Sequence, residues 1–371
     1  MSEFASEIMN NAEMTEKQLI FLCSLLEENR PKKIVEIGVA AGGTSVVILD
    51  KLISLDYEAK MFSVDLSREY YRDKKKLTGY LIDNYVNSHE CKKVFHKKMI
   101  GDYVINYLQE IGKDIDFLIL DTVHSLPGEI FDFLALLPFL NKSAIVVLHD
   151  ITLNHLSNNR EGIATQVLLD CVVGEKLTPI SIYEEYPGIG AFKINEDTFK
   201  YIDDVFNAMM ITWKYIPSES ELILYRNHYL KYYSQKQAFV FDEAIRYNRN
   251  TALKAQRKKM DDIKALYNFF KSIQHKKVYI YGNGYISKKI ENILYTCNIP
   301  VEAHIVSKKD NEQFKLLSMD EFIHINNIAS NNYAIIVGVV PETQQEIIST
   351  LCKYGIDQIV LPTDQILQII S

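Results

Sequence analysis

IVEIGVAAGGTS, from Ile34 to Ser45, is the stretch of sequence that decides the fold. A hydrophobic run leads into it, which is typical of a buried parallel strand, and glycines follow at positions 38, 42 and 43. Nucleotides bind at such strand-to-helix turns in open α/β sheets. The turn lacks the GxGxxG spacing of dinucleotide-binding loops and the GK[ST] ending of a P-loop. It therefore indicates a ligand that carries no phosphate.

The rest of the first half continues the alternation of apolar strands and helices. A capping box at Thr15 and Gln18 opens the first helix, and Pro31 ends it. Near-continuous apolar strands between helices are typical of a mostly parallel sheet covered on both faces, the Rossmann-like α/β class. The sequence predicts strands over residues 32–38, 60–66, 93–99, 115–121, 143–150, 179–184 and 189–194, and helices over residues 44–53, 70–88, 102–111, 127–138 and 161–173.

A chain of 371 residues is too long for one average domain, and three parts are predicted. Residues 1–196 form the first α/β domain. Residues 197–275 are rich in tyrosine and charged residues with helical spacing, and form a helical connector. Two interpretations of the connector stay open, a linker packed on both domains or an arm for homodimerisation. Residues 276–371 form a small Rossmann-like α/β domain with a glycine turn at Gly282, and this domain either binds a ligand or has a structural or dimerising role.

Composition excludes several classes of protein. The net charge of −7 argues against nucleic acid as the main partner, because phosphate binding needs a basic surface. No apolar run reaches the about 18 residues of a membrane span, and the N-terminus is unlike a signal peptide. Five scattered cysteines without CxxC spacing are typical of reduced thiols. We therefore expect a cytoplasmic protein without a membrane span.

The ends of two further predicted strands indicate which other groups the ligand carries. Asp65 ends the second predicted strand, where a carboxylate can accept both hydroxyls of a ribose. The third strand runs into Gly101-Asp102-Tyr103, a turn placed to border an adenine. Together with the glycine turn, these residues predict a site for an adenosine without phosphate.

With these residues, the segment from about 15 to 195 resembles class I S-adenosylmethionine-dependent methyltransferases. Within this class, the segment most resembles the small-molecule O-methyltransferase branch. It shares an EIGxxxGxS-type run from Glu36, a DxxH after the fourth strand and His149-Asp150 after the fifth. The resemblance implies S-adenosylmethionine as cofactor, with Gly38 at its methionine part. The cofactor-binding residues that follow from it are Glu36, Gly38, Gly42, Thr44, Ser45, Asp65, Gly101, Asp102, Tyr103 and Asp121.

Methyl transfer to oxygen needs a group that removes or acidifies the hydroxyl proton. Asp121 and Asp150 end neighbouring strands, and two carboxylates with water suit Mg²⁺; in metal-dependent relatives, acidic residues at these positions hold the ion. His124 and His149 are candidate bases, and with Asp121 they form the predicted catalytic set. Relatives commonly show DGDHS where this chain has Val123, which removes one carboxylate. A metal-free histidine mechanism therefore stays open beside Mg²⁺.

The expected reaction is O-methylation of a sugar or nucleotide-linked sugar, a bacterial precursor of surface polysaccharide. The sugar rests on the likeness of the last domain to modules attached to bacterial sugar-modifying transferases, which is an analogy of fold. Two other hypotheses stay open: a non-catalytic binding or scaffold protein that keeps the fold, which Val123 favours, and an NAD-binding oxidoreductase. Asn154, His155 and Arg160 either line the acceptor pocket or fill a loop.

Overall fold

The computed structural model describes residues 8, 12–88, 93–152, 163–179, 188–307, 316–326, 328, 332–363 and 366. Contacts divide the chain into two compact units, Met1–Thr251 and Ala252–Ser371. The division lies inside the segment predicted as a connector, so the first unit extends well beyond residue 196. No helix among the described residues is long and apolar enough to span a membrane.

The first unit contains a seven-stranded sheet in the order β3-β2-β1-β4-β5-β7-β6. All neighbours from β3 to β5 pair in parallel, whereas β7 is antiparallel to both β5 and β6. The order of strands reverses between β1 and β4, which confirms the Rossmann-like class. The strands are β1 (Lys33–Ile37), β2 (Ala59–Asp65), β3 (Val94–Ile100), β4 (Ile115–Leu120), β5 (Leu140–His149), β6 (Glu175–Leu177) and β7 (Ile189–Lys193).

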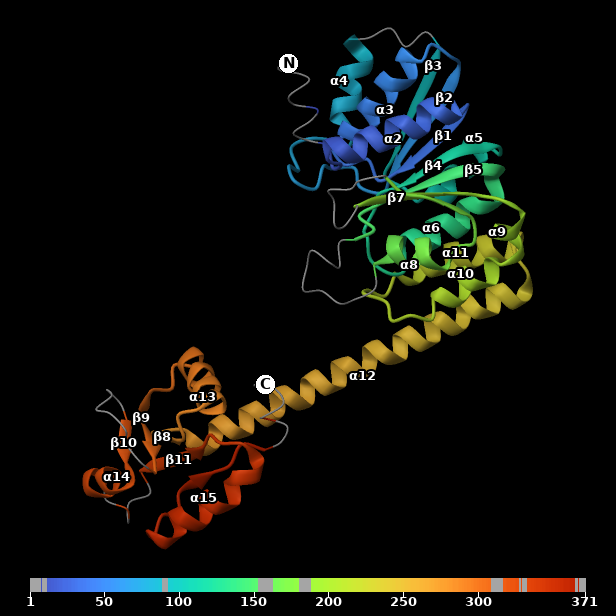
Figure 1. Ribbon diagram of the computed structural model, residues 1–371. Coiled ribbons are helices and arrows are strands. Elements are labelled where there is room, and N and C mark those ends of the chain that lie inside the picture. The colour runs from blue at the N-terminus through green and yellow to red at the C-terminus, as the bar shows by residue number, and fades with distance from the viewer. Residues whose placement is uncertain are drawn as a thin grey trace. The chain divides into compact units, whose positions relative to one another are not determined.

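Helices cover both faces of this sheet, as Figure 1 shows. Alternate side chains of a strand point to opposite faces, so Ile34 and Val35 of β1 lie in two different hydrophobic clusters. One face carries α2 (Glu16–Asn29), α3 (Gly43–Ser54) and α4 (Tyr80–Ser88). The other face carries α5 (Val104–Ile111), α6 (Gly128–Leu136), α8 (Ala164–Cys171), α10 (Ile202–Ala208) and α11 (Glu219–Tyr232). The Thr15–Gln18 capping box that opens α2 is confirmed.

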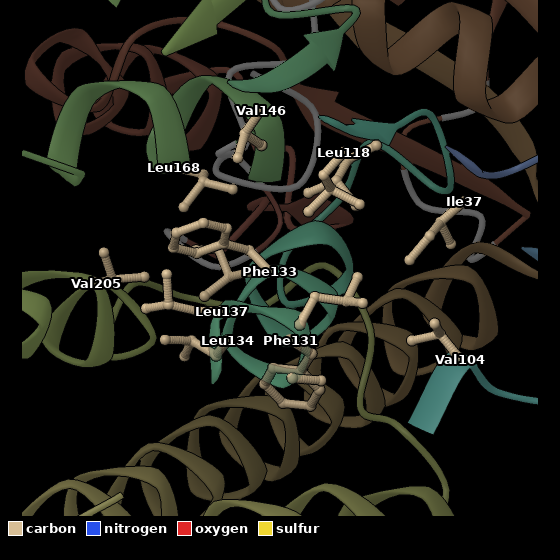
Figure 2. Packing of buried hydrophobic residues seen from close by; sticks show 14 of the residues in the cluster. Ile37, Val104, Leu118, Phe131, Phe133, Leu134, Leu137, Val146, Leu168 and Val205 are labelled. Carbon is tan, nitrogen blue, oxygen red and sulfur yellow. The ribbon is translucent and has the colours of Figure 1, made fainter. Parts of the chain in front are cut away.

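The hydrophobic cluster that contains Val35 is centred on α6. Phe131, Phe133 and Leu134 are fully buried, and Figure 2 shows them beside Leu118 of β4 and Val205 of α10. Burying one such side chain contributes about 1.5–3 kcal/mol, so α6 is firmly fixed on the sheet. Its first turn therefore has a defined position at the end of β4.

The predicted helix over residues 70–88 is wrong in its first half. Residues 70–79 form turns, and α4 begins only at Tyr80. The chain there folds over the glycine turn, because the Gly79 amide donates to the Ala40 carbonyl and the Leu81 amide to the Ala41 carbonyl. Gly79 has φ of +70°, a conformation that a helix excludes. Tertiary contacts to another loop thus outweigh the local helical pattern.

The segment after residue 196 is built into the first unit through α11. The Tyr229 hydroxyl donates to the Phe131 carbonyl at 3.0 Å, and the Tyr233 hydroxyl donates to the Leu134 carbonyl at 2.6 Å. His228 Nε2 lies 2.9 Å from the Ala135 carbonyl oxygen. The helices of this segment are α9 (Glu196–Lys200), α10, α11 and α12 (Gln235–Ile273), of which α12 runs across the division between the units.

The second unit is a small α/β domain with a parallel sheet in the order β10-β9-β8-β11-β12. Its apolar strands alternate with helices as predicted, and a short strand, β10, is added at one edge. The strands are β8 (Lys277–Tyr281), β9 (Val301–Val306), β10 (Leu316–Ser318), β11 (Tyr333–Val337) and β12 (Ile359–Val360), and the helices α13 (Tyr285–Thr296), α14 (Met319–Ile325) and α15 (Pro341–Lys353).

Candidate functional site

A cavity of about 610 Å³ lies at the carboxyl ends of the parallel strands in the first unit. Its lining includes the residues that follow β1, β2, β4 and β5, so it surrounds the point where the strand order reverses. Ligands bind at this point in open α/β sheets. Of the predicted site residues, the cavity brings together Gly38, Thr44, Asp65, Asp102, Tyr103, Asp121, His124, His149 and Asp150.

Gly38 allows β1 and β4 to end in close contact. It has φ of +91°, and a Cβ atom there would lie 1.8 Å from the carbonyl oxygen of Asp121. The Asp121 amide in turn donates to the Ile37 carbonyl at 2.9 Å. Only glycine satisfies both the backbone conformation and the available space. At Gly38 the turn therefore presents only backbone to the cavity.

Asp65 holds the glycine turn in place. Its Oδ2 atom accepts from the amides of Val39 at 2.8 Å and Ala40 at 3.2 Å. Its Oδ1 atom accepts from the Ser67 amide at 2.8 Å. A carboxylate has about four acceptor positions, so Asp65 keeps capacity for a ligand hydroxyl at the cavity.

Glu36, Gly42, Ser45 and Gly101 do not line the cavity, unlike the other predicted cofactor residues. Glu36 is 1% exposed and accepts hydrogen bonds from the hydroxyls of Ser45 and of Ser63. Burial raises the pKa of Glu36 to about 8, although these two hydroxyls lower it in part. Glu36 therefore supports the turn from below, where a ligand does not reach.

Thr44 faces the cavity, unlike Gly42 and Ser45 of the same turn. It lines the cavity at the start of α3, it is 6% exposed, and its hydroxyl has no hydrogen-bond partner within the described chain. A buried polar atom without a partner costs free energy unless a ligand or water satisfies it. Thr44 is therefore a candidate contact for a bound molecule.

His149 and Asp121 join the ends of β5 and β4. His149 is 4% exposed, and its Nδ1 atom lies 2.9 Å from Asp121 Oδ1. Its Nε2 atom lies 3.4 Å from Gln18 Oε1 and 3.6 Å from Asp150 Oδ1. Burial lowers the pKa of His149, but the hydrogen bond to Asp121 and its charge outweigh burial, so the pKa is raised above 6.5. Oxygen acceptors at both nitrogens favour the protonated ring.

His124 is more open than His149. Its Nε2 atom lies 3.4 Å from Asp150 Oδ2 and 3.6 Å from Asp121 Oδ1, and its side chain is 20% exposed. The loop around it is fixed by Glu129, which is fully buried and accepts from the His124 amide at 2.7 Å. His124 and Asp150 both have φ of +54°, a conformation that non-glycine residues hold at a cost, often at functional sites.

The donor set fits Mg²⁺ poorly. Asp121, His124 and His149 are the group of described residues whose ligand atoms lie within 4.8 Å of one another. Mg²⁺ prefers oxygen ligands, whereas two imidazoles suit transition metals. The predicted ion between Asp121 and Asp150 would therefore meet imidazole nitrogens where it needs oxygens.

Several residues of the lining are not predicted by the sequence. Glu13 precedes the first predicted helix and Tyr71 lies in the predicted helix over residues 70–88, and neither gives a sequence signal for a site. Asp132 does give one, because it is an acidic residue within the apolar run of α6. Tyr215 and Glu221 come from the segment read as a connector. Asn154, His155 and Arg160, the expected acceptor residues, lie outside the described residues.

The cavity is strongly acidic. Its described lining contains no lysine or arginine, and the carboxyl groups belong to Glu13, Asp65, Glu69, Asp102, Asp121, Asp132, Asp150 and Glu221. A cleft lined by one sign of charge raises the local concentration of ligands of the opposite sign. The cavity therefore favours a cationic or uncharged ligand over an anionic one.

A protein-family model matches the part of the chain that forms most of this cavity. Residues 35–151 match the family model described as "Methyltransferase domain". This segment runs from β1 to the end of β5 and carries the glycine turn, Asp65 and the Asp121–His149 pair. Residues 35–151 therefore form a methyltransferase domain, in agreement with the class I resemblance read from the sequence. No curated protein matches the chain.

Several solved structures that are similar to this chain are methyltransferases. The O-methyltransferase TomG from Streptomyces achromogenes, in complex with SAM, is 14% identical with a TM-score of 0.38, over 53% of this chain and 91% of its own. The O-methyltransferase from Bacillus cereus, in complex with SAH, is 14% identical with a TM-score of 0.37, over 53% and 92%. A methyltransferase from Geobacter sulfurreducens is 13% identical with a TM-score of 0.36, over 53% and 90%.

Proposed function

We propose that the chain transfers a methyl group from S-adenosylmethionine to a hydroxyl oxygen of a small molecule. One observation carries this proposal: a single cavity joins the phosphate-free glycine turn at Gly38 and Asp65 to the cluster of His124, His149 and Asp121. The acidic lining suits S-adenosylmethionine, because its sulfonium and ammonium groups are cations. The match of residues 35–151 to a methyltransferase domain supports the same reaction class.

The chemical step is a displacement at the methyl carbon. The acceptor oxygen forms a bond to this carbon as the bond to the sulfonium sulfur breaks, and the sulfur keeps the electron pair. The proton of the acceptor hydroxyl passes to His124 Nε2. General base catalysis requires this nitrogen to lie within hydrogen-bonding distance of the acceptor oxygen. The carboxylates of Asp150 and Asp121, at 3.4 and 3.6 Å from Nε2, then stabilise the imidazolium.

His149 acts by position in this proposal. Oxygen atoms lie near both of its ring nitrogens, Asp121 at Nδ1 and Gln18 and Asp150 at Nε2, so the ring is placed as a hydrogen-bond donor. It holds the Asp121 carboxylate at 2.9 Å beside the glycine turn. Because the donor set fits Mg²⁺ poorly, the proposed mechanism runs through His124 without a metal step.

The acceptor that fits best is uncharged or cationic, and a sugar hydroxyl remains our favoured acceptor. Carboxylates and tyrosines such as Asp132 and Tyr71 are suitable hydrogen-bonding partners for a polyhydroxylated molecule. A nucleotide-linked sugar fits less well, because no lysine or arginine of the described lining would balance its phosphates.

Transfer of a labelled methyl group tests this proposal. The full chain is incubated with methyl-labelled S-adenosylmethionine and a panel of neutral sugars, amino sugars and nucleotide sugars. We expect label in a neutral or amino sugar, unchanged by excess chelator. Binding of S-adenosylhomocysteine without any transfer would favour the scaffold alternative, and transfer that chelator abolishes and Mg²⁺ restores would overturn the metal-free route.

A further inference from the structure

We propose that α11 completes the adenine end of the cofactor cavity, where the carboxyl groups of Glu221 and Asp132 accept from the amino group of the ring. This inference rests on the proposed use of S-adenosylmethionine. It assigns a binding role to a segment that follows the seven-stranded sheet in the sequence, which the sequence alone identifies only as a helical connector.

The position of α11 is fixed by its contacts with α6. The Tyr225 hydroxyl donates to Asp132 Oδ1 at 2.5 Å, and the Tyr225 ring packs 5.0 Å from that of Phe131. Tyr229 is fully buried one turn further and bonds the Phe131 carbonyl. The side chains of the first half of α11 are therefore held at the cavity before any ligand binds.

The residues that α11 brings to the cavity meet the turn after β3. Tyr225 and Tyr103 form an edge-to-face pair with ring centroids 6.2 Å apart, and the Tyr103 hydroxyl bonds the Glu221 carboxyl. Tyr103 directly follows Gly101-Asp102, the turn expected to border an adenine. Since β2, β1 and β4 separate β3 from β5 in the sheet, this end of the cavity is away from His149.

Two exposed apolar side chains supply a surface for a flat ring. Leu66 is 54% exposed and Val123 is 56% exposed, yet both line the cavity. They directly follow Asp65 at the end of β2 and Thr122 after β4, so they flank the glycine turn. Exposed apolar side chains in a cavity mark a ligand surface, and a purine would cover them. Val123, which removes a metal-binding carboxylate, gains a role here.

The polar groups at this end select the edge of the ring. Glu221 and Asp132 both line the cavity, and burial raises the pKa of both carboxyls, that of Asp132 to about 7. In either protonation state, an oxygen of such a carboxyl can accept a hydrogen bond from a ligand. The adenine edge offers an amino donor to such an oxygen. A hypoxanthine ring has a carbonyl in place of the amino group and therefore offers no N–H donor at that position.

Calorimetric titration of S-adenosylhomocysteine into the full chain tests the inference, with Glu221→Leu as the test variant and Glu219→Leu as its control. Glu219 lies on the same helix but is 68% exposed and pairs with Arg249 away from the cavity. We expect Kd to rise at least about tenfold for Glu221→Leu and to stay unchanged for Glu219→Leu. The wild-type chain should also prefer S-adenosylhomocysteine to its analogue with a carbonyl in place of the ring amino group, and Glu221→Leu should lose this preference.

A milder variant, Glu221→Gln, keeps the test valid if Glu221→Leu does not fold; it should weaken binding and preserve the melting temperature. Unchanged Kd values in both Glu221 variants, with firm binding by the wild type, would overturn the role of α11 and leave the proposed function intact. Failure of the wild type to bind S-adenosylhomocysteine would instead overturn the proposed function itself.

Discussion

The Nδ1 atom of His149 lies 2.9 Å from Oδ1 of Asp121, so a side-chain pair links the carboxyl ends of β5 and β4 directly above the glycine turn. Gly38 makes this arrangement feasible, because it lets the Asp121 backbone approach β1 without a clash. Catalysis of methyl transfer depends on holding the reacting groups in alignment. The His149–Asp121 pair therefore fixes part of the cavity lining, and the proposed reaction depends on this fixed geometry.

Replacing His124 by alanine should lower turnover without weakening cofactor binding. A general base contributes about 10²–10⁴-fold to a rate, so we expect kcat to fall at least about 100-fold. The Kd of S-adenosylhomocysteine should stay within about twofold of wild type, because the proposed contact of His124 is with the acceptor hydroxyl. Steady-state kinetics and calorimetry measure the two quantities. An equal loss of both would remove His124 from the role of base.

Replacing Gly38 by alanine should destabilise the first unit and abolish cofactor binding. A non-glycine residue at φ of +91° costs about 1–3 kcal/mol, and the contact with the Asp121 carbonyl adds to this cost. Gly112→Ala is the matched control, because φ is +72° there but a Cβ would meet only the flexible Lys33 side chain, with Nζ at 3.7 Å. Denaturant unfolding and calorimetry should show binding lost only in Gly38→Ala. Equal losses of stability and of cofactor binding in the two variants would contradict the close approach of Gly38 to the Asp121 carbonyl.

Glu36 predicts a dependence of stability on pH. Its pKa is raised from 4.5 to about 8 in the folded chain, so between these values the folded state holds a proton that the unfolded state releases. The free energy of unfolding should therefore fall with rising pH in this window, by at most about 1.4 kcal/mol per pH unit. Urea unfolding of wild type and Glu36→Gln at pH 5 to 8 isolates this group. If the difference in free energy of unfolding between wild type and Glu36→Gln does not change with pH, the raised pKa of Glu36 is contradicted.

The segment from 197 to 251 should be required for folding of the methyltransferase domain. Residues such as Phe206, Trp213 and Tyr229 are buried in the same cluster as Phe131 of α6. Ending the chain at residue 196 would expose that face, so we expect no cooperative unfolding transition and no binding of S-adenosylhomocysteine. A chain ending at residue 251 should retain both. A fragment of residues 1–196 that melts cooperatively and binds the ligand would contradict this account.

The sequence predicts the strand ends of the site well and the remainder of its lining poorly. Asp65, Asp121 and His149 could be placed because apolar runs define the strands and parallel strands end at one edge of the sheet. Tyr225 and Glu221 could not, since their contacts join residues far apart in the chain, as in the Tyr225–Asp132 bond across 93 positions. Glu36 shows the opposite error: its place in the EIG motif suggested a ligand contact, but the serines around it hold it below the turn.

Direct binding of S-adenosylhomocysteine tests the central claim, that the cavity above Gly38 and Asp65 is a cofactor site. In calorimetry with the full chain at a ligand concentration far above micromolar, we predict saturable binding with one site per chain and a matching rise in melting temperature. Asp65→Ala should weaken this binding. Absence of heat and of thermal stabilisation under the same conditions would contradict the account.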